Sequence, residues 1–111
     1  MLHVVLSVHS MYNNPVRYEW NSEKNELLKS ECNISFEKIC FHIKRRDIWR
    51  ITDHPNKEQY PNQQLFYVII EGYIYVVPFV EEKNYIFLKT IIPSRKATRE
   101  YRKEMEIENE I

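Results

Sequence analysis

The chain has 111 residues, of which 43% are hydrophobic and 29% charged, and its formal net charge is zero. This length supports one domain around a single core, and the balance of apolar and charged residues is that of a folded chain. Because Gly72 is the only glycine, the sequence contains neither a G-x-G-x-x-G turn nor a P-loop, which excludes the nucleotide-binding enzymes that depend on them. Zero net charge also excludes an attraction of the whole molecule to nucleic acid.

The cysteines and histidines do not follow the pattern of a metal site. Cys32 and Cys40 lie eight positions apart without a C-x-x-C pair, and the four histidines are not clustered. We therefore expect neither a metal nor another cofactor. The opening apolar run is too short for a signal peptide, and no run approaches the ~20 residues that a membrane span needs. Two reduced cysteines fit a cytoplasmic protein, so we expect a cytoplasmic chain without a membrane contact.

The N-terminal part predicts one strand and leaves one segment open. We expect residues 1–111 to form a single domain, in which residues 1–15 are a candidate extension. Within that extension, residues 2–8 are β-prone but mixed in pattern, so they form either a strand or a loose segment ahead of a turn at residues 11–15. Residues 16–20 alternate between apolar and polar side chains, which predicts a strand.

Two helices are expected next. The first begins after an N-cap at residues 21–22 and runs to about residue 31, and its buried side is expected to carry Leu27, Leu28 and Cys32. The second begins after Ser35. It is the clearest amphipathic helix of the chain, because its apolar residues follow the i, i+3, i+4, i+7 pattern: Phe36, Ile39, Cys40 and Ile43.

The second half predicts a strand, a loop and a β-meander. Residues 47–52 read as a strand, and residues 53–64 form a polar loop with two prolines. Three β-branched and aromatic runs at hairpin spacing then predict an antiparallel meander: residues 65–70, 73–80 and 85–92. Pro78 cannot donate to a ladder, so we expect its strand to be at an edge or bulged there.

Ser94 caps a last helix that runs to about residue 109, with Ala97, Tyr101 and Met105 as its apolar stripe. The order of elements predicts an α+β fold in which two N-terminal helices and one C-terminal helix pack on one face of an antiparallel meander.

Charge is unevenly distributed over this last helix. Residues 89–103 carry six basic side chains and one acidic one, and residues 104–111 form an acidic tail with four glutamates. The basic run is either a face that holds a polyanion or a solvated helix surface with i, i+4 ion pairs.

Three motifs follow one another along the chain: YEWNSEKN at residues 18–25, ISFE at residues 34–37 and IPSRKATREY at residues 92–101. Together they resemble the BrnT family of type II toxins. The resemblance covers about residues 17–103. Three features depart from the family pattern: the extra Pro93, a longer loop around residues 54–62, and residues 1–15, which have no family counterpart.

The resemblance implies a RelE-like fold, a ribonuclease activity that halts translation, and neutralisation by a BrnA-like ribbon-helix-helix antitoxin. The family motif positions fall at Trp20, Lys24 and Arg95. Metal-free RNA cleavage needs cations on the phosphate and proton carriers beside it, so we expect Lys24 and Arg95 on the scissile phosphate and His54 as a proton carrier.

Each candidate also has a structural interpretation. Lys24 fits a solvated lysine, Arg95 a salt bridge from helix to sheet, His54 an ordinary loop histidine, and Trp20 a core residue. Substrate binding is the candidate role of Trp20, Tyr60 and Arg99, and Tyr60 and Trp49 are the candidates for base stacking.

Two functions from different classes remain open. The first is a metal-independent endoribonuclease toxin that arrests translation. The second is a non-catalytic module of the same fold that holds an antitoxin or a nucleic acid. A small-molecule enzyme has little support, because no convergent set of polar residues is evident in the sequence.

Overall fold

The computed structural model describes the backbone of residues 16–110 and the side chains of residues 16–108. Its elements are, in order, β1 (Tyr18–Glu19), α2 (Ser22–Cys32), α3 (Phe36–Lys44), β2 (Ile48–Asp53), β3 (Gln63–Ile70), β4 (Tyr73–Glu81), β5 (Ile86–Leu88), β6 (Ile92–Pro93) and α4 (Arg95–Glu110). The predicted α+β class is confirmed. The strand or loose segment expected at residues 2–8 lies outside the described residues.

The sheet is largely antiparallel and is built around β4. Its strand order is β1-β5-β4-β3-β2, β6 also pairs with β4, and only β1 runs parallel to its neighbour, β5. The two residues between β3 and β4, Glu71 and Gly72, have φ angles of 51° and 76°. Positive φ at both central positions is what a tight two-residue hairpin turn requires, and it explains why the single glycine stands here.

The prediction of one strand over residues 85–92 is wrong, because two short strands, β5 and β6, occupy that range. Pro78 explains the break. On β4, pairing with β5 begins at Phe79 and pairing with β6 ends at Val76, so Pro78 falls between the two segments. Pro78 keeps its place opposite Leu65 of β3, and its carbonyl accepts a 2.8 Å hydrogen bond from the N–H of Lys89. The strand therefore loses only the one donor that proline lacks, on the side of β5 and β6.

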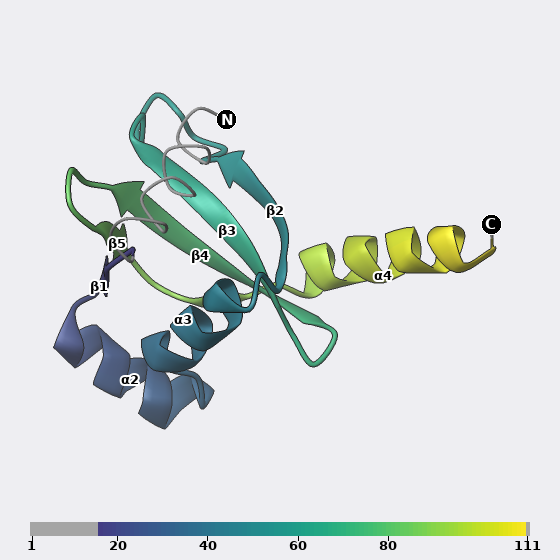
Figure 1. Ribbon diagram of the computed structural model, residues 1–111, viewed down its shortest axis with the longest axis horizontal. Coiled ribbons are helices and arrows are strands. Elements are labelled where there is room, and N and C mark those ends of the chain that lie inside the picture. The colour runs from purple at the N-terminus through teal and green to yellow at the C-terminus, as the bar shows by residue number, and fades with distance from the viewer. Residues whose placement is uncertain (1–15, 111) are drawn as a thin grey trace.

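Helices α2 and α3 cover one face of the sheet (Figure 1). The four predicted apolar residues of α3 are all buried and pack against the strands: Phe36, Ile39, Cys40 and Ile43. In α2 the expected buried side is only partly right. Leu28 is buried, but Leu27 is 47% exposed and Cys32 is exposed as well.

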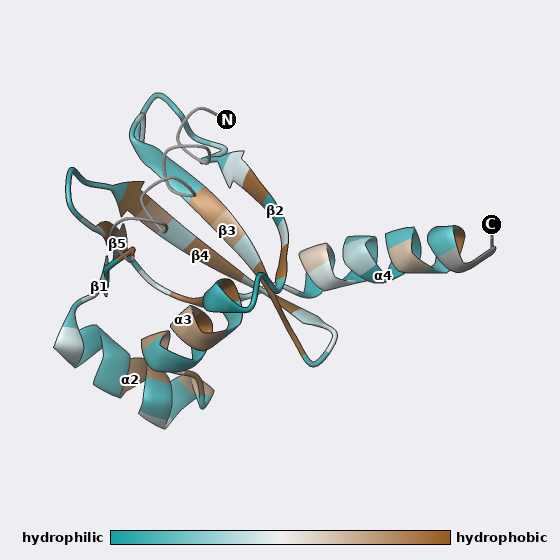
Figure 2. Ribbon diagram, viewed as in Figure 1, coloured by the Kyte–Doolittle hydropathy of each residue, from teal (hydrophilic) through white to brown (hydrophobic). Residues whose placement is uncertain are grey.

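The contacting side of α2 runs through Asn25 and Leu28, which are three residues apart. Leu27 lies about 100° around the helix from Leu28 and therefore faces away from the sheet. Figure 2 shows that α2 is mostly hydrophilic, in keeping with a helix that contributes few core residues.

The last helix does not join the other two. The side-chain oxygen of Thr98 accepts a 2.8 Å hydrogen bond from the backbone N–H of Ile74, and Tyr101 meets the ring of Trp49. Ile48 and Ile51 of the same strand pack into the core on the α3 side, whereas Trp49 points to the opposite face. The expectation that all helices pack on one face is thus wrong for α4.

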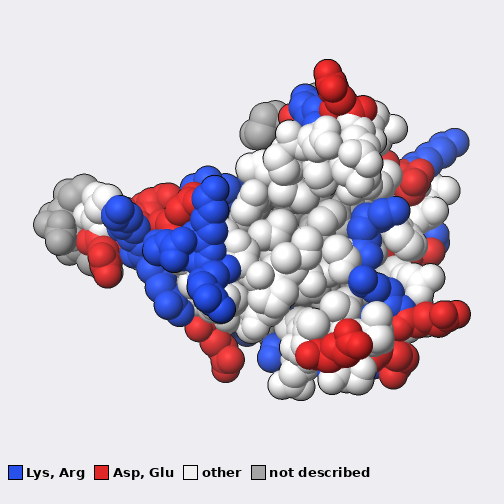
Figure 3. All heavy atoms as spheres, turned by 180° about the vertical axis from the view of Figure 1, so that it is seen from behind, with Lys and Arg blue, Asp and Glu red and all other residues white. Residues whose placement is uncertain are grey.

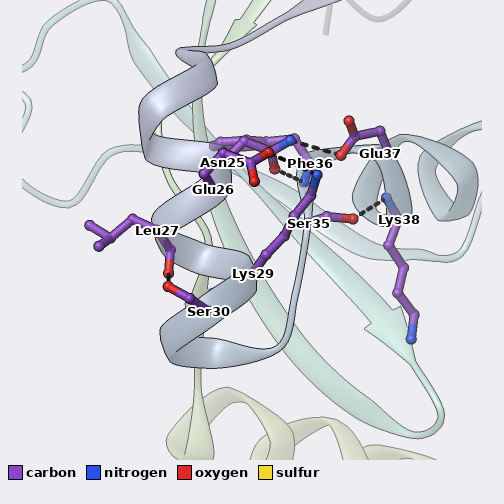
Figure 4. Close-up of polar contacts among 9 residues, drawn as sticks. All are labelled: Asn25, Glu26, Leu27, Lys29, Ser30, Ser35, Phe36, Glu37 and Lys38. Carbon is purple, nitrogen blue, oxygen red and sulfur yellow. Dashed lines mark hydrogen bonds and ion pairs between the residues drawn. The ribbon is translucent and has the colours of Figure 1, made fainter.

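The junction of α2 and α3 depends on one buried amide, Asn25 (Figure 4). Its Oδ1 accepts a 2.8 Å hydrogen bond from the backbone N–H of Phe36, and its Nδ2 donates a 2.8 Å bond to Oε1 of Glu37. The predicted caps are confirmed, since Asn21 accepts from the N–H of Lys24 and Ser35 from that of Lys38. Asn25 thereby satisfies a further free N–H at the start of α3.

We predict that Asn25→Ala lowers the free energy of unfolding by about 1–3 kcal/mol, because the buried N–H of Phe36 loses its acceptor. Urea unfolding of the two proteins measures the difference. Asn84→Ala is the matched control, since Asn84 is exposed in the turn between β4 and β5. Equal stability of wild type and Asn25→Ala would show that this amide does not hold the junction.

The same pair predicts a pH dependence. The hydrogen bond from Asn25 holds the pKa of the Glu37 carboxyl below its ordinary 4.5. A lowered pKa in the folded state stabilises the protein above the ordinary pKa, and this contribution is lost as the pH falls through the folded-state value. The stability gap between wild type and Asn25→Ala should therefore be wider at about pH 7 than at about pH 3. A gap that widens on acidification would contradict the assignment.

Candidate nucleic-acid interface

Five basic residues gather along one side of α4, and we call them the basic flank: Arg95, Lys96, Arg99, Arg102 and Lys103. Helical spacing explains the segregation. Positions 95, 99 and 102 follow i, i+4, i+7, and the glutamates at 100, 104 and 108 follow i, i+4, i+8 on another side, while Glu106 ends the basic row one turn after Arg102. All five basic side chains are exposed.

The basic flank makes no close ion pair with the described side chains. Among the residues whose side chains the structure describes, none of the five has an ion pair or a side-chain hydrogen bond, and the one ion pair of α4 joins Glu104 to Arg50 of β2. The i, i+4 ion pairs that a purely solvated helix would use are therefore not formed here. A row of unpaired cations is the electrostatic condition for binding a polyanion.

Beside this helix lies the face of the sheet that α2 and α3 leave uncovered, which we call the open face. Side chains alternate along a strand, and Phe66, Val68 and Val77 point into the core with α3. Their neighbours must therefore point to the other side. The open face consists of six half-buried residues, Trp49, Tyr67, Ile69, Val76, Val80 and Phe87, together with Leu65 and Pro78, which are buried.

Apart from Arg50, which pairs with Glu104, the open face carries no charged side chain, and it is bordered by cations. Figure 3 shows this surface between the basic side chains of α4 and a second basic border on the opposite side. The Nζ atom of Lys89 lies 5.6 Å from the ring centroid of Phe87. The ring of Trp49 is 5.9 Å from that of Tyr67 and 5.7 Å from that of Tyr101, both edge-on. Half-buried aromatic rings flanked by cations are the combination that accepts stacked bases and phosphates together.

Of the predicted site residues, Arg95 and Arg99 belong to this surface. Arg95 is the first residue of α4, where unpaired backbone N–H groups favour an anion. Part of that N-terminus is already satisfied, because Ser94 Oγ accepts from the N–H of Ala97. The salt bridge from helix to sheet that was the structural interpretation of Arg95 is not formed with any described residue; Arg50 and Glu104 make such a contact instead.

Lys24 and Trp20 lie elsewhere. Lys24 is half-buried in the first turn of α2, and the ring of Trp20 stacks on Phe36 with 5.5 Å between centroids. This contact confirms the core interpretation of Trp20. Helices α2 and α4 leave the sheet at opposite ends of the molecule in Figure 1. The structure therefore does not bring Lys24 next to Arg95.

His54 and Tyr60 form a third location, in the loop between β2 and β3. Their rings are 4.5 Å apart, and Nδ1 of His54 accepts a 3.0 Å bond from the backbone N–H of Asn56. The bond leaves Nε2 as the nitrogen of this ring available to another group. This loop and α4 lie apart in Figure 1, so His54 does not share a site with Arg95.

A second histidine serves the fold. Nδ1 of His42 lies 2.9 Å from Oδ2 of Asp47, which also accepts a 3.2 Å bond from Arg45. These contacts, with that of His42 the larger, lower the pKa of the Asp47 carboxyl. The cluster closes the turn from α3 to β2, so His42 has a structural role.

One open groove of about 710 Å³ lies between β1 and α3, away from the open face. Its lining is mainly apolar and includes Tyr18, Trp20, Cys40 and Phe41. Burial raises the pKa of Tyr18 to about 12 and that of Cys40 to about 11. Both groups are therefore neutral near pH 7, and the groove offers no activated nucleophile.

Sequence reasoning missed most of the open face, including Tyr67 and Phe87. Their alternation with core residues was visible, but it does not tell which face of a sheet the helices leave bare. Within residues 16–108, no group of three or more His, Cys, Asp or Glu side chains is placed to hold a metal ion. None of the described helices is long and apolar enough to cross a membrane.

Comparisons with family models, with curated proteins and with solved structures find no match for this chain. The resemblance of its three motifs to the BrnT family therefore stays a prediction from the sequence. A functional interpretation depends on that resemblance together with the open face and the basic flank.

Proposed function

We propose that this chain is the toxin of a type II toxin-antitoxin system, an endoribonuclease that works in the cytoplasm and cleaves RNA without a metal to arrest translation. The RNA lies on the open face, along the basic flank. The observation that carries the proposal is the row of five exposed cations, unpaired among the described side chains, beside a surface of aromatic rings.

The basic flank supplies the phosphate contacts. Arg95, Arg99 and Arg102 follow one another at single-turn spacing, so successive phosphates of one strand can reach them. A guanidinium binds phosphate through two parallel hydrogen bonds and keeps its charge at any physiological pH. In the cleavage step, Arg95 and Arg99 stabilise the charge of the phosphorane.

The open face supplies the base contacts. Stacking on aromatic rings requires bases that are free of a duplex, so Tyr67, Trp49 and Phe87 favour a single strand. Within a fold whose net charge is zero, this placement confines RNA to one side of the molecule.

The second candidate function is a module of the same fold that binds without cleaving. The observation that favours it is the separation of Lys24, His54 and Arg95 on three elements, because general acid-base catalysis needs the proton carrier within hydrogen-bond reach of the reacting group. In either case we expect a BrnA-like ribbon-helix-helix antitoxin as the protein partner.

We predict that induced expression of the wild-type chain arrests bacterial growth and that Arg99→Ala/Arg102→Ala relieves the arrest. Lys38→Ala/Lys83→Ala is the matched control, since it removes the same charge from exposed positions away from α4. It should arrest growth as the wild type does. If all three proteins arrest growth equally, or none does, the toxin assignment fails.

Purified protein separates the two functions. We predict that wild type cleaves single-stranded RNA in EDTA, and that Arg99→Ala/Arg102→Ala lowers the slope of log K against log salt by about 1.4, at about 0.7 for each phosphate that the variant no longer neutralises. Binding without cleavage would support the module instead. RNA binding of unchanged strength and salt dependence in this variant would contradict the proposed surface.

A further inference from the structure

Two neighbouring residues of β2, Trp49 and Arg50, point to the same side of the sheet. In a regular strand, successive side chains alternate between faces. Here Ile48 and Ile51, which are three positions apart, both pack into the core, and the pairing of β2 with β3 shifts between Ile48 and Arg50. The shift is a β-bulge, and it leaves Trp49 and Arg50 together on the side that faces α4.

The bulge builds a contact between sheet and helix, which we call the Arg50 bridge. The guanidinium carbon of Arg50 lies 3.5 Å from the ring centroid of Trp49. One of its terminal nitrogens lies 3.2 Å from Oε2 of Glu104 in α4. The Trp49 ring in turn meets Tyr101 of the same helix, so Glu104 and Tyr101 are both held from β2.

This contact is the second attachment of α4. The first is in the opening turn, where Thr98 Oγ1 accepts from the N–H of Ile74 and also donates to the carbonyl of Ser94. Beyond these points the helix leaves the body of the molecule (Figure 1). A helix fixed at its first turn alone can change its angle to the sheet, whereas a second contact about one and a half turns further along fixes that angle.

We propose that Arg50 is a positioning residue, which holds α4 at the angle that keeps the basic flank beside the open face. An exposed ion pair alone stabilises little. The Trp49 ring strengthens the Arg50–Glu104 ion pair, because stacking on the ring holds the guanidinium of Arg50 in one orientation. The consequence for RNA rests on the proposed function, but the angle of α4 is a property of the chain itself.

Distance measurements between two spin labels test the angle without RNA. One label is placed on Cys32, which is exposed in α2, and the other on Ile107→Cys, an exposed position in α4, in a Cys40→Ala background. The parent protein should show one narrow distance distribution. Arg50→Ala and Glu104→Gln should each broaden it at least twofold.

Glu100→Gln is the matched control, because Glu100 is an exposed glutamate of α4 without an ion pair to the described side chains, and it should leave the distribution narrow. Distributions for Arg50→Ala and Glu104→Gln that match the parent would overturn the proposal.

RNA binding then separates positioning from direct contact. If Arg50 contacts RNA phosphate directly, Glu104 competes with the phosphate for its guanidinium. In that case Glu104→Gln, which removes the competing charge, should tighten RNA binding. If the Arg50 bridge sets the angle, Glu104→Gln should weaken RNA binding several-fold, as Arg50→Ala does. Tighter binding by Glu104→Gln would contradict the positioning role. A parent chain that binds no RNA would contradict the proposed function. The spin-label distances would still show whether the Arg50 bridge fixes the angle of α4.

Discussion

Strand β4 is the constraint on which the rest of the structure depends. It pairs with β3 along its length, with β5 at its end and with β6 at its start, and the N–H of Ile74 within it holds the first turn of α4. Pro78 divides the β5 and β6 segments by withholding one ladder donor. The chain after β5 therefore returns to the start of β4, and α4 begins at that corner.

The helices cover only one face of the sheet. The apolar stripe of α3 and the narrow contacting side of α2 suffice for one face, and α4 reaches the other only through its first turns. Soluble proteins seldom leave a contiguous apolar surface without a use for it. Here that surface adjoins cations that form no ion pair with the described side chains, which is why we propose a polyanion with flat aromatic bases as its partner and not an apolar one.

Some of this was predictable from local rules. The buried residues of α3 and the caps at Asn21 and Ser35 were correct because periodicity and capping are local properties of the sequence. The split of the last strand was not predicted, since it depends on what stands opposite Pro78 in three dimensions. The β-bulge at Trp49 and Arg50 was hidden for the same reason, because a strand-like run of residues does not show where one is inserted.

The candidate site was predicted only in part. Arg95 and Arg99 fall on one surface because both lie on α4, so helical spacing alone relates them. Lys24 and His54 lie on other elements, and their distance from Arg95 depends on the packing of the whole chain. The resemblance to BrnT toxins and the cleavage of RNA remain predictions, and the open face is what the structure adds in their support.

The most direct measurement is ultraviolet cross-linking of a single-stranded RNA to the purified chain, with the modified residues identified by mass spectrometry. We predict adducts on the open face and its border, at Trp49, Tyr67, Phe87 or Tyr101, and their loss when competing polyanion is added. Adducts confined to the groove between β1 and α3, at Tyr18 or Phe41, would contradict this placement of the RNA.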